Sequence, residues 1–158
     1  MQYALDVFID TLKSFGIYPE SEAVERSGLQ LTQEVGRRKT YRDSRSNKFS
    51  VYSGVKGKIN SVEMTLRSTD MDSLDGPNEY EAVITSFNDD FDNVWADLGR
   101  ILGNTGVVSE NPYRDALRAV SWHIDPENQL TLELRHEDKE LPVRLVMAFL
   151  APREEESA

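Results

Sequence analysis

The fold is decided by residues 29–66, which read LQLTQEVGRRKTYRDSRSNKFSVYSGVKGKINSVEMTL. Apolar residues alternate with polar ones in three segments of this stretch: Leu29, Leu31 and Val35; Phe49, Val51 and Val55; and Val62, Met64 and Leu66. A period of two is typical of a strand with one buried face. Because the three strands follow each other directly along the chain, we expect an antiparallel meander with its other face in solvent.

Residues 36–47, GRRKTYRDSRSN, separate the first two of these strands. They show no apolar periodicity, so we expect an exposed, basic hairpin connection. Residues 54–57, Gly-Val-Lys-Gly, are predicted to form a turn before the third strand.

One helix is predicted near the start of the chain, over residues 3–15. Its apolar residues recur at the spacing of one helix face, and they are Leu5, Phe8, Ile9, Leu12 and Phe15. Gly16 is expected to end this helix, since glycine favours the position that follows a helix. Residues 19–26 fit either a short second helix, with Pro19 in its first turn, or a loop.

A central pair of helices is predicted after a polar loop over residues 68–78 and a fourth strand over residues 80–87. The first helix of the pair begins with Asn88 or Asp89 as its cap, and Gly103 ends it. Its apolar stripe consists of Phe91, Val94, Trp95, Leu98, Ile101 and Leu102. The second helix is expected over residues 111–120, because Asn-Pro at its start is typical of a helix N-terminus.

Three further strands are predicted over residues 122–124, 130–134 and 143–150, with turns at 125–128 and 136–139. Because strands are grouped in runs and do not alternate with helices, the predicted fold class is α+β. The expected order is an N-terminal helix, an antiparallel sheet of several strands, the central helix pair and the C-terminal strands. We expect a single domain over residues 1–151, with Trp95 and Trp122 in its core, and a disordered acidic tail over residues 152–158.

The composition is that of an ordinary soluble domain of 158 residues, of which 39% are hydrophobic and 29% charged. The chain has no cysteine, which excludes disulfide bonds and cysteine-bound zinc. Its longest apolar stretch, residues 141–150, is shorter than the about 20 residues that cross a membrane. A basic leader followed by an uninterrupted apolar run is also missing. These observations predict a cytoplasmic protein that does not bind membranes.

Charged residues are sorted along the chain. Residues 36–67 contain nine Lys or Arg and two Asp or Glu, whereas residues 68–99 contain nine Asp or Glu and no Lys or Arg. The whole chain has a formal net charge of -10. This excess disfavours nucleic acid and anionic membranes as partners, because both need clustered cations. It favours association with a basic protein.

The sharpest signal for a metal is the acidic loop. Asp70, Asp72 and Asp75 precede Gly76, with Glu81 downstream, and a hard cation such as calcium needs several oxygen ligands. The spacing differs from that of an EF-hand by one residue, and strands are expected on either side where an EF-hand has helices. A solvated loop is the simpler interpretation.

Signals for catalysis are weaker still. Residues 137–139, Glu-Asp-Lys, match a loose pattern of metal-dependent nucleases together with Asp125, but they fall in a predicted turn. His123 and His136 are isolated, and His123 is expected to point outward from a strand. The sequence has neither a Gly-x-Ser-x-Gly elbow nor a glycine-rich phosphate loop. We therefore predict no enzyme activity and no cofactor.

The leading hypothesis is an acidic protein-binding module that neutralises or escorts a basic protein partner. Bacterial immunity proteins and acidic secretion chaperones share this profile of composition, although no motif connects the chain to either class. The predicted contact residues are Asp70, Asp72, Asp75, Glu79, Asp89, Asp90 and Asp92. The last three also suit the start of a helix, where its dipole favours acids.

Two alternatives remain from the sequence. The first is a metal-dependent enzyme or calcium-binding domain that uses the acidic loop 68–81. The second is a nucleic-acid-binding protein, or an acidic mimic of nucleic acid. Direct binding of nucleic acid would use the basic run of Arg37, Arg38, Lys39, Arg42, Arg45 and Lys48, with Tyr41 among them.

Overall fold

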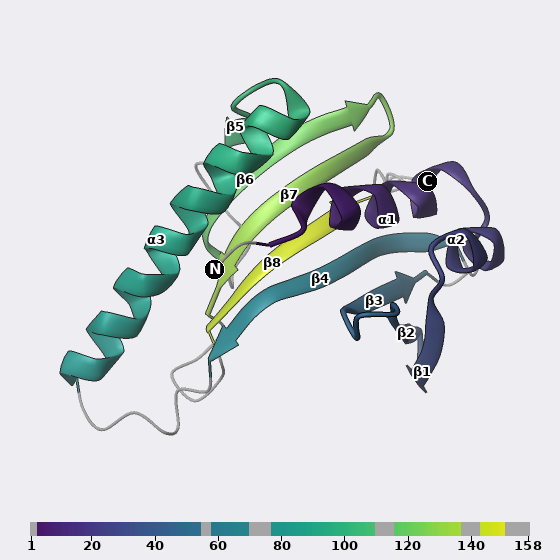
Figure 1. Cartoon of the computed structure of the whole chain (residues 1–158), viewed down its shortest axis with the longest axis horizontal. Coiled ribbons are helices and arrows are strands. Elements are labelled where there is room, and N and C mark those ends of the chain that lie inside the picture. Colours follow the sequence, from purple (N-terminus) through teal and green to yellow (C-terminus); the bar gives the residue numbers. More distant parts are fainter. Residues whose placement is uncertain (1–2, 55–57, 70–76, 110–115, 137–142, 151–158) are drawn as a thin grey trace. The chain divides into compact units, whose positions relative to one another are not determined.

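A computed structural model describes residues 3–54, 58–69, 77–109, 116–136 and 143–150 (Figure 1). Over these residues the elements follow the order α1 (Leu5–Ile17), α2 (Glu20–Arg26), β1 (Gln30–Val35), β2 (Arg38–Arg42), β3 (Lys48–Ser53), β4 (Ile59–Thr69), α3 (Pro77–Leu102), β5 (Val107–Val108), β6 (Ala116–Asp125), β7 (Asn128–Arg135) and β8 (Val143–Leu150). The fold is therefore α+β, as the sequence predicts.

The strands have the order β1-β2-β3-β4-β8-β7-β6-β5 in one sheet, and β1 to β4 form consecutive antiparallel pairs. The chain divides into two compact units. The first contains Met1–Met64, His123–Leu130 and Ala148–Ala158, and the second contains Thr65–Trp122 and Thr131–Met147. The single domain over residues 1–151 stays a prediction, and the tail 152–158 lies outside the described residues.

Helix α1 of the first unit forms where its apolar spacing predicts it, and all five residues of the stripe are buried. Phe8 meets Phe49 of β3 edge-on, with 6.5 Å between the ring centroids. Phe15 contacts Tyr41 of β2 at a centroid distance of 6.4 Å. These aromatic contacts fix α1 on one face of the strands β2 and β3.

Gly16 does not end α1, and this part of the sequence prediction is wrong. The helix continues through Gly16 to Ile17. A Cβ atom at position 16 would lie 2.6 Å from Cε1 of Phe149, which is closer than any real contact. The glycine is present because Phe149 packs against the helix backbone, and it has no role as a helix stop.

Residues 20–26 form helix α2, so the helix interpretation of this segment is confirmed. Pro19 precedes it at the N-cap position with a φ of -56°. Ala23 is buried, and the guanidinium of Arg26 lies 4.2 Å from the ring centroid of Tyr18. This cation–π contact connects the last turn of α2 to the residue that follows α1.

The meander has four strands, where the sequence predicts three, and the last of them, β4, continues from the first unit into the second. The residues expected to form a hairpin connection, 36–47, contain strand β2. Gly36, with a φ of +58°, makes the tight turn from β1, and both Thr40 and Tyr41 are buried. The predicted turn at 54–57 lies mostly outside the described residues, since 55–57 are not described.

Strand β1 exists as predicted, but it is not half-buried. All six of its residues are exposed, including Leu31 at 52% and Val35 at 54%. Leu29, which precedes the strand, is buried. The reason is that β1 is the last strand at one edge of the sheet, beyond the strands that α1 covers with aromatic contacts.

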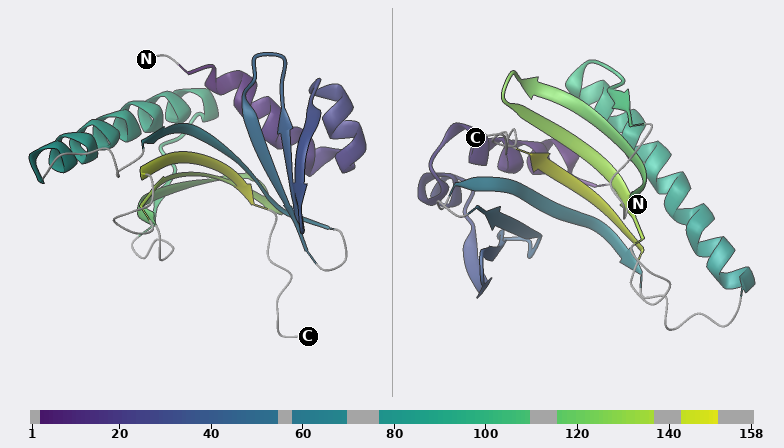
Figure 2. Two further views of the ribbon diagram at one scale, coloured as in Figure 1. Left: turned by 90° about the horizontal axis from the view of Figure 1, so that it is seen from below. Right: turned by 180° about the vertical axis from the view of Figure 1, so that it is seen from behind.

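In the second unit, one long helix replaces both the predicted strand 80–87 and the predicted helix start at Asn88 or Asp89. Helix α3 comprises 26 residues. Figure 2 shows it as one unbroken helix. Phe87, Phe91, Val94 and Leu98 are buried, so the 3–4 spacing of apolar residues already begins before residue 88.

The predicted end of this helix is confirmed. Gly103 adopts a φ of +82°, and its N–H donates to the carbonyl oxygen of Gly99 at 2.9 Å. Three residues of the predicted apolar stripe are buried, whereas Trp95 and Leu102 are half-buried and Ile101 is exposed.

The second member of the predicted helix pair is wrong where it can be compared. Residues 116–120 belong to strand β6, and 111–115 lie outside the described residues. The segment forms a strand because buried and exposed side chains lie on its two faces: Val120 and Trp122 are buried, whereas Leu117 and His123 are exposed. A single helix, α3, therefore stands in place of the expected pair over the described residues.

The three C-terminal strands are confirmed as β6, β7 and β8, and residues 126–127 form the turn between β6 and β7. Most of the turn predicted at 136–139 lies outside the described residues. Trp122 is 1% exposed and so belongs to the core, while Trp95 is only half-buried. Within the described segments, no helix combines the length and apolar character needed to cross a membrane.

Candidate functional site

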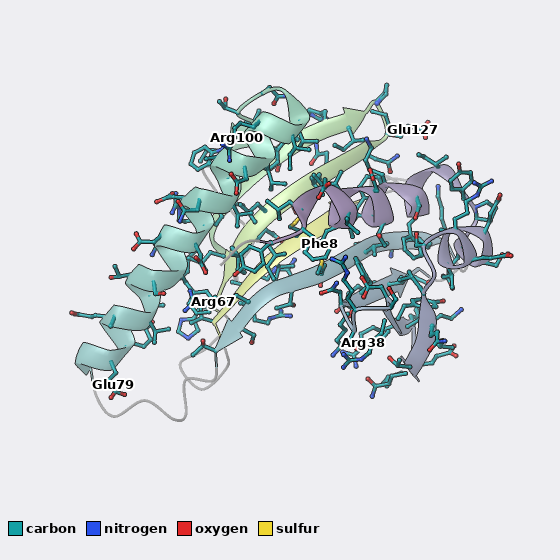
Figure 3. All side chains as sticks on the ribbon, viewed as in Figure 1. Phe8, Arg38, Arg67, Glu79, Arg100 and Glu127 are labelled. Atoms are coloured by element: carbon teal, nitrogen blue, oxygen red, sulfur yellow. The ribbon has the colours of Figure 1, made fainter. Side chains whose placement is uncertain are left out.

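The structure divides the seven predicted contact residues into two groups. Asp70, Asp72 and Asp75 lie outside the described residues, whereas Glu79, Asp89, Asp90 and Asp92 all belong to helix α3. Glu79 and Asp89 are exposed, and Figure 3 shows Glu79 near the N-terminal end of the helix. Asp90 and Asp92 have partners inside the second unit.

Asp90 pairs with Arg67 of strand β4. Nη1 of Arg67 lies 2.8 Å from Oδ2 of Asp90 and also donates to Oγ of Ser86 at 3.0 Å. The guanidinium is 4.2 Å from the ring centroid of Phe87, one turn earlier on α3. Arg67 therefore forms an ion pair with one residue of α3 and a cation–π contact with another.

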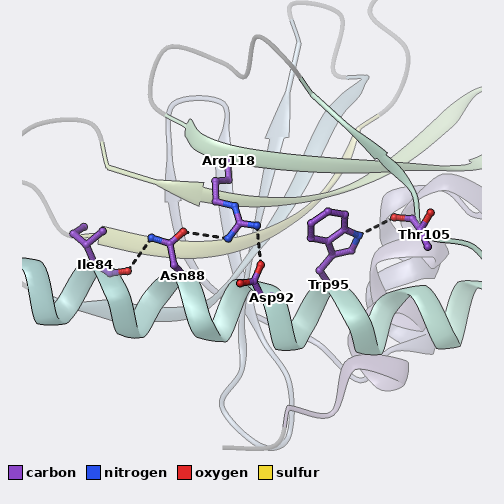
Figure 4. Close-up of polar contacts among 6 residues, drawn as sticks. All are labelled: Ile84, Asn88, Asp92, Trp95, Thr105 and Arg118. Carbon is purple, nitrogen blue, oxygen red and sulfur yellow. Dashed lines mark hydrogen bonds and ion pairs between the residues drawn. The ribbon is translucent and has the colours of Figure 1, made fainter.

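Asp92 pairs with Arg118 of strand β6 in a similar arrangement (Figure 4). Nη2 of Arg118 donates to Oδ1 of Asp92 at 2.7 Å, and Nη1 donates to Oδ1 of Asn88 at 3.1 Å. The amide nitrogen of Asn88 donates to the carbonyl oxygen of Ile84, which fixes the orientation of the amide. The guanidinium also lies 4.2 Å from the ring centroid of Phe91.

These two arginines give Asp90 and Asp92 a role in packing α3 against strands. Neither Arg67 nor Arg118 was expected from the sequence to hold this helix. A signal was present for Arg118, because it lies between apolar residues in a segment that alternates as a strand. A cation within such a segment often covers a packed surface with its stem.

The acids that remain on the surface of α3 are fewer than the sequence suggests. The helix contains six Asp or Glu and one basic residue, Arg100, which pairs with Asp97. Glu79, Glu81 and Asp89 are the exposed carboxylates besides Asp92. Because Glu79 has an interaction partner of its own, the anionic character of the helix surface rests on Glu81 and Asp89.

In the first unit, Glu20 at the start of α2 holds two side chains of strand β2. Its Oε2 accepts hydrogen bonds from Lys39 Nζ at 3.0 Å and from the Tyr41 hydroxyl at 2.8 Å. The hydrogen bond to Glu20 raises the pKa of Lys39 above its ordinary value. Burial raises the pKa of the Tyr41 phenol strongly, and the hydrogen bond to Glu20 raises it further.

The other cations of the basic run behave differently. Arg37, Arg38, Arg42, Arg45 and Lys48 form no ion pair with any residue that the structure describes. Arg42 donates to the carbonyl oxygen of Ser46 at 3.0 Å. Lys39 is paired with Glu20 and the charge of Arg45 acts on the Asp43 carboxylate, whereas the other cations of the run have no acid paired with them in the described part of the chain.

The acid nearest to this run in sequence, Asp43, is occupied by its own turn. It accepts hydrogen bonds from the backbone N–H groups of Arg45 and Asn47 and from the side chain of Asn47. Burial alone would raise the pKa of Asp43, but these hydrogen bonds together lower it below its ordinary value. Asp43 therefore serves as an acceptor for the turn.

The groups considered for metal or catalytic chemistry do not converge in the described residues. No cluster of three or more potential metal ligands occurs in the segments that the structure describes. Asp125 accepts hydrogen bonds from Asn128 and from the backbone of Glu127, which lower its pKa. His123 is exposed, as predicted, and Nδ1 of His136 lies 3.2 Å from the hydroxyl of Tyr80.

Comparison with known proteins gives no match: neither a family model, nor a curated protein, nor a solved structure is significantly similar to this chain.

Proposed function

We propose that the protein is a non-enzymatic binding module that captures a basic protein partner and neutralises or escorts it. The observation that carries this proposal is the anionic surface of α3, where Glu81 and Asp89 are exposed and the single basic residue of the helix is paired with Asp97. The predicted contact residue Glu79 is also exposed but has an interaction partner of its own. The predicted residues Asp70, Asp72 and Asp75 directly precede this helix in the sequence and add to the same charge.

The physical mechanism is electrostatic steering. A surface with charges of one sign raises the rate at which an oppositely charged partner arrives, and this effect declines as salt is added. Asp90 and Asp92 are removed from the attracting set, because their carboxylates already hold Arg67 and Arg118. Substitutions at these two positions would change stability together with charge, so they are unsuitable probes of binding.

A stopped-flow measurement with a fluorescent lysine-rich peptide tests the proposal. The variant E81Q/D89N removes two charges from α3, and D6N/D10N removes two exposed charges from the first unit. We expect the association rate to fall with rising salt and to fall further in the α3 variant than in the control variant.

Two results would contradict the proposal. A salt-independent association rate would remove the electrostatic step. Equal slowing by both double variants would mean that only the net charge matters, and that α3 is not the attracting surface.

A further inference from the structure

The strands β1, β2 and β3 of the first unit have two faces, and the contacts with α1 and α2 lie on one of them. On the other face Thr40 is buried in the middle, while Arg42 and Lys48 are exposed. Residues directly opposite each other in antiparallel strands point to the same face. The register places Leu31, Tyr41 and Phe49 in one row, and Glu34, Lys39 and Val51 in the next. This is the face of the aromatic contacts with α1 and of the hydrogen bonds to Glu20.

The opposite face carries the unpaired cations. Its three rows are Val35, Arg38 and Tyr52; Gln33, Thr40 and Ser50; and Gln30, Arg42 and Lys48. We call this surface the cationic face, and Figure 3 labels Arg38 on it. The register adds one acid from β4, Glu63, which lies opposite Ser50 and has its own interaction partner.

Several cations of the cationic face lack an acidic partner or a hydrogen-bond acceptor among the described residues. Arg42 and Lys48 are exposed, and neither they nor Arg38 form an ion pair with a described residue. Nε of Arg38 is buried and has no hydrogen-bond partner among the described residues. A buried hydrogen-bond donor without an acceptor destabilises the protein, so a ligand that supplies an acceptor for this N–H binds more favourably. Arg45, in the adjoining turn, adds a further exposed cation.

The neighbouring edge of the sheet limits the shape of the ligand. Strand β1 lies at the end of the strand order, and all six of its residues are exposed. Natural edge strands are usually protected by Lys, by Pro or by bulges. Residues 30–35 contain neither Lys nor Pro, but an irregularity in register between Leu31 and Gln33 interrupts the first half of the strand. An extended polypeptide can therefore add to the regular part of this edge, residues 33–35, which lies beside Arg38.

From these observations we infer that the cationic face and the edge of β1 bind an extended, acidic segment of a partner protein. Carboxylates of the segment pair with Arg38 and Arg42 of β2, and its backbone pairs with β1, while Lys48 on the next strand adds to the positive potential of the face. Charge complementarity favours an acidic ligand, and the exposed edge favours a polypeptide over nucleic acid. The three rows contain one aromatic residue, Tyr52. Proteins that bind single-stranded nucleic acid usually stack successive bases on several aromatic side chains.

This surface is independent of the proposed role of α3, since it belongs to the other compact unit and attracts ligands of the opposite charge. The net charge of -10 repels an acidic segment only at long range. At physiological ionic strength such repulsion is screened beyond about 8 Å, and the contacts with the face act within that distance.

Fluorescence anisotropy with a labelled peptide of alternating Glu and Val tests the inference. The matched control peptide has Gln in place of Glu, and a third peptide carries N-methyl groups on alternate backbone nitrogens. We expect the acidic peptide to bind at least about tenfold more tightly than either control, because charge-assisted hydrogen bonds and strand pairing are then both available.

Two protein variants locate the site. R38Q/R42Q removes two charges from the cationic face, and K13Q/R100Q removes two charges elsewhere. We expect at least about a tenfold loss of peptide affinity in the first variant and little change in the second. Urea unfolding of both variants establishes that each is folded.

Three outcomes would overturn the inference. They are equal binding of the acidic and Gln peptides, equal affinity of both protein variants, and unchanged binding of the N-methylated peptide. A uridine oligonucleotide provides a further arm. If it binds more tightly than the acidic peptide and loses affinity in R38Q/R42Q, the face recognises nucleic acid.

Discussion

Arg118 joins strand β6 to helix α3 through Asp92, with 2.7 Å between its Nη2 and the carboxylate oxygen Oδ1. The same guanidinium covers the ring of Phe91, so one side chain provides both an ion pair and an aromatic contact. Arg67 of β4 repeats this arrangement with Asp90 and Phe87. Two acids of α3 thus hold the helix in place, although the sequence presents them as surface charge.

We predict that the arginine contributes more to stability than its acidic partner. Asp92 is 56% exposed at its side chain, so D92N should cost less than about 1 kcal/mol. R118A also loses the hydrogen bond to Asn88 and the cation–π contact with Phe91. It should lower the free energy of unfolding by about 1–2 kcal/mol. Urea unfolding measures both values.

The variant D89N is the control for this comparison, since Asp89 is exposed on the same helix and should tolerate the change within about 0.5 kcal/mol. If D92N and R118A destabilise the protein equally, the ion pair dominates and the aromatic contact contributes little. That result would contradict the ranking given above.

The helix held by these contacts shows why local sequence patterns gave the wrong boundary. Residues 80–87 look like a strand in isolation, and Asn88 followed by acids looks like a helix cap. In the structure Asn88 instead bonds to the carbonyl oxygen of Ile84 and to Arg118, thirty residues away. A capping side chain within a helix is explained by such tertiary partners, which a short sequence window does not contain.

Strand β2 was missed for a related reason. It has one large apolar residue, Tyr41, and its other buried residue is Thr40. It is paired with β1 and β3 on its two sides, and Glu20 adds hydrogen bonds to Lys39 and Tyr41 from about twenty residues away in the sequence. By contrast, α1 was predicted well because its five apolar residues repeat at helical spacing and are all buried.

Of the candidate site, only the clustering of acidic and basic residues could be predicted from the sequence. Sorted blocks of acids and bases are visible in the sequence, but the choice of partners is not. Asp90 and Asp92 proved to be paired within the second unit, whereas Arg38, Arg42 and Lys48 form no ion pair with a described residue. Pairing depends on which strands lie beside which helix, and this is a property of the fold.

Gly106 offers a second test, because it combines a left-handed backbone with close packing. Its φ is +72°, and a Cβ atom there would lie 2.7 Å from Cε2 of Trp122 and 2.8 Å from Cγ1 of Val120. Gly103 has a φ of +82° with no atom within 4 Å of its Cβ position. Both substitutions by alanine strain the backbone, at about 1–2 kcal/mol, but only G106A also disturbs the core.

We therefore expect G106A to lower the free energy of unfolding by about 1–3 kcal/mol more than G103A does. Urea unfolding followed by tryptophan fluorescence measures the difference, and the emission of Trp122 should shift in G106A alone. Equal destabilisation by the two substitutions would show that Trp122 and Val120 move aside without cost.

The third prediction concerns alkaline pH and the phenol of Tyr41. Burial and the hydrogen bond to Glu20 raise its pKa in the folded chain, while the unfolded value is about 10. A group whose pKa is raised by folding contributes stability that is fully present below the unfolded pKa. This contribution is lost as the pH rises above about 10, by up to about 1.4 kcal/mol per pH unit.

Comparison with Y41F isolates this contribution, because phenylalanine has no proton to lose. Wild type should be the more stable protein at neutral pH by about 1 kcal/mol, since its hydroxyl donates to Glu20. That advantage should shrink above pH of about 10 and then reverse, and urea unfolding at a series of pH values measures it. In E20Q, absorbance at the phenolate band should show Tyr41 titrating at a lower pH than in wild type, because the carboxylate charge is gone. A constant difference between wild type and Y41F at all pH values would mean that the phenol ionises equally in both states, and that Glu20 does not hold its proton.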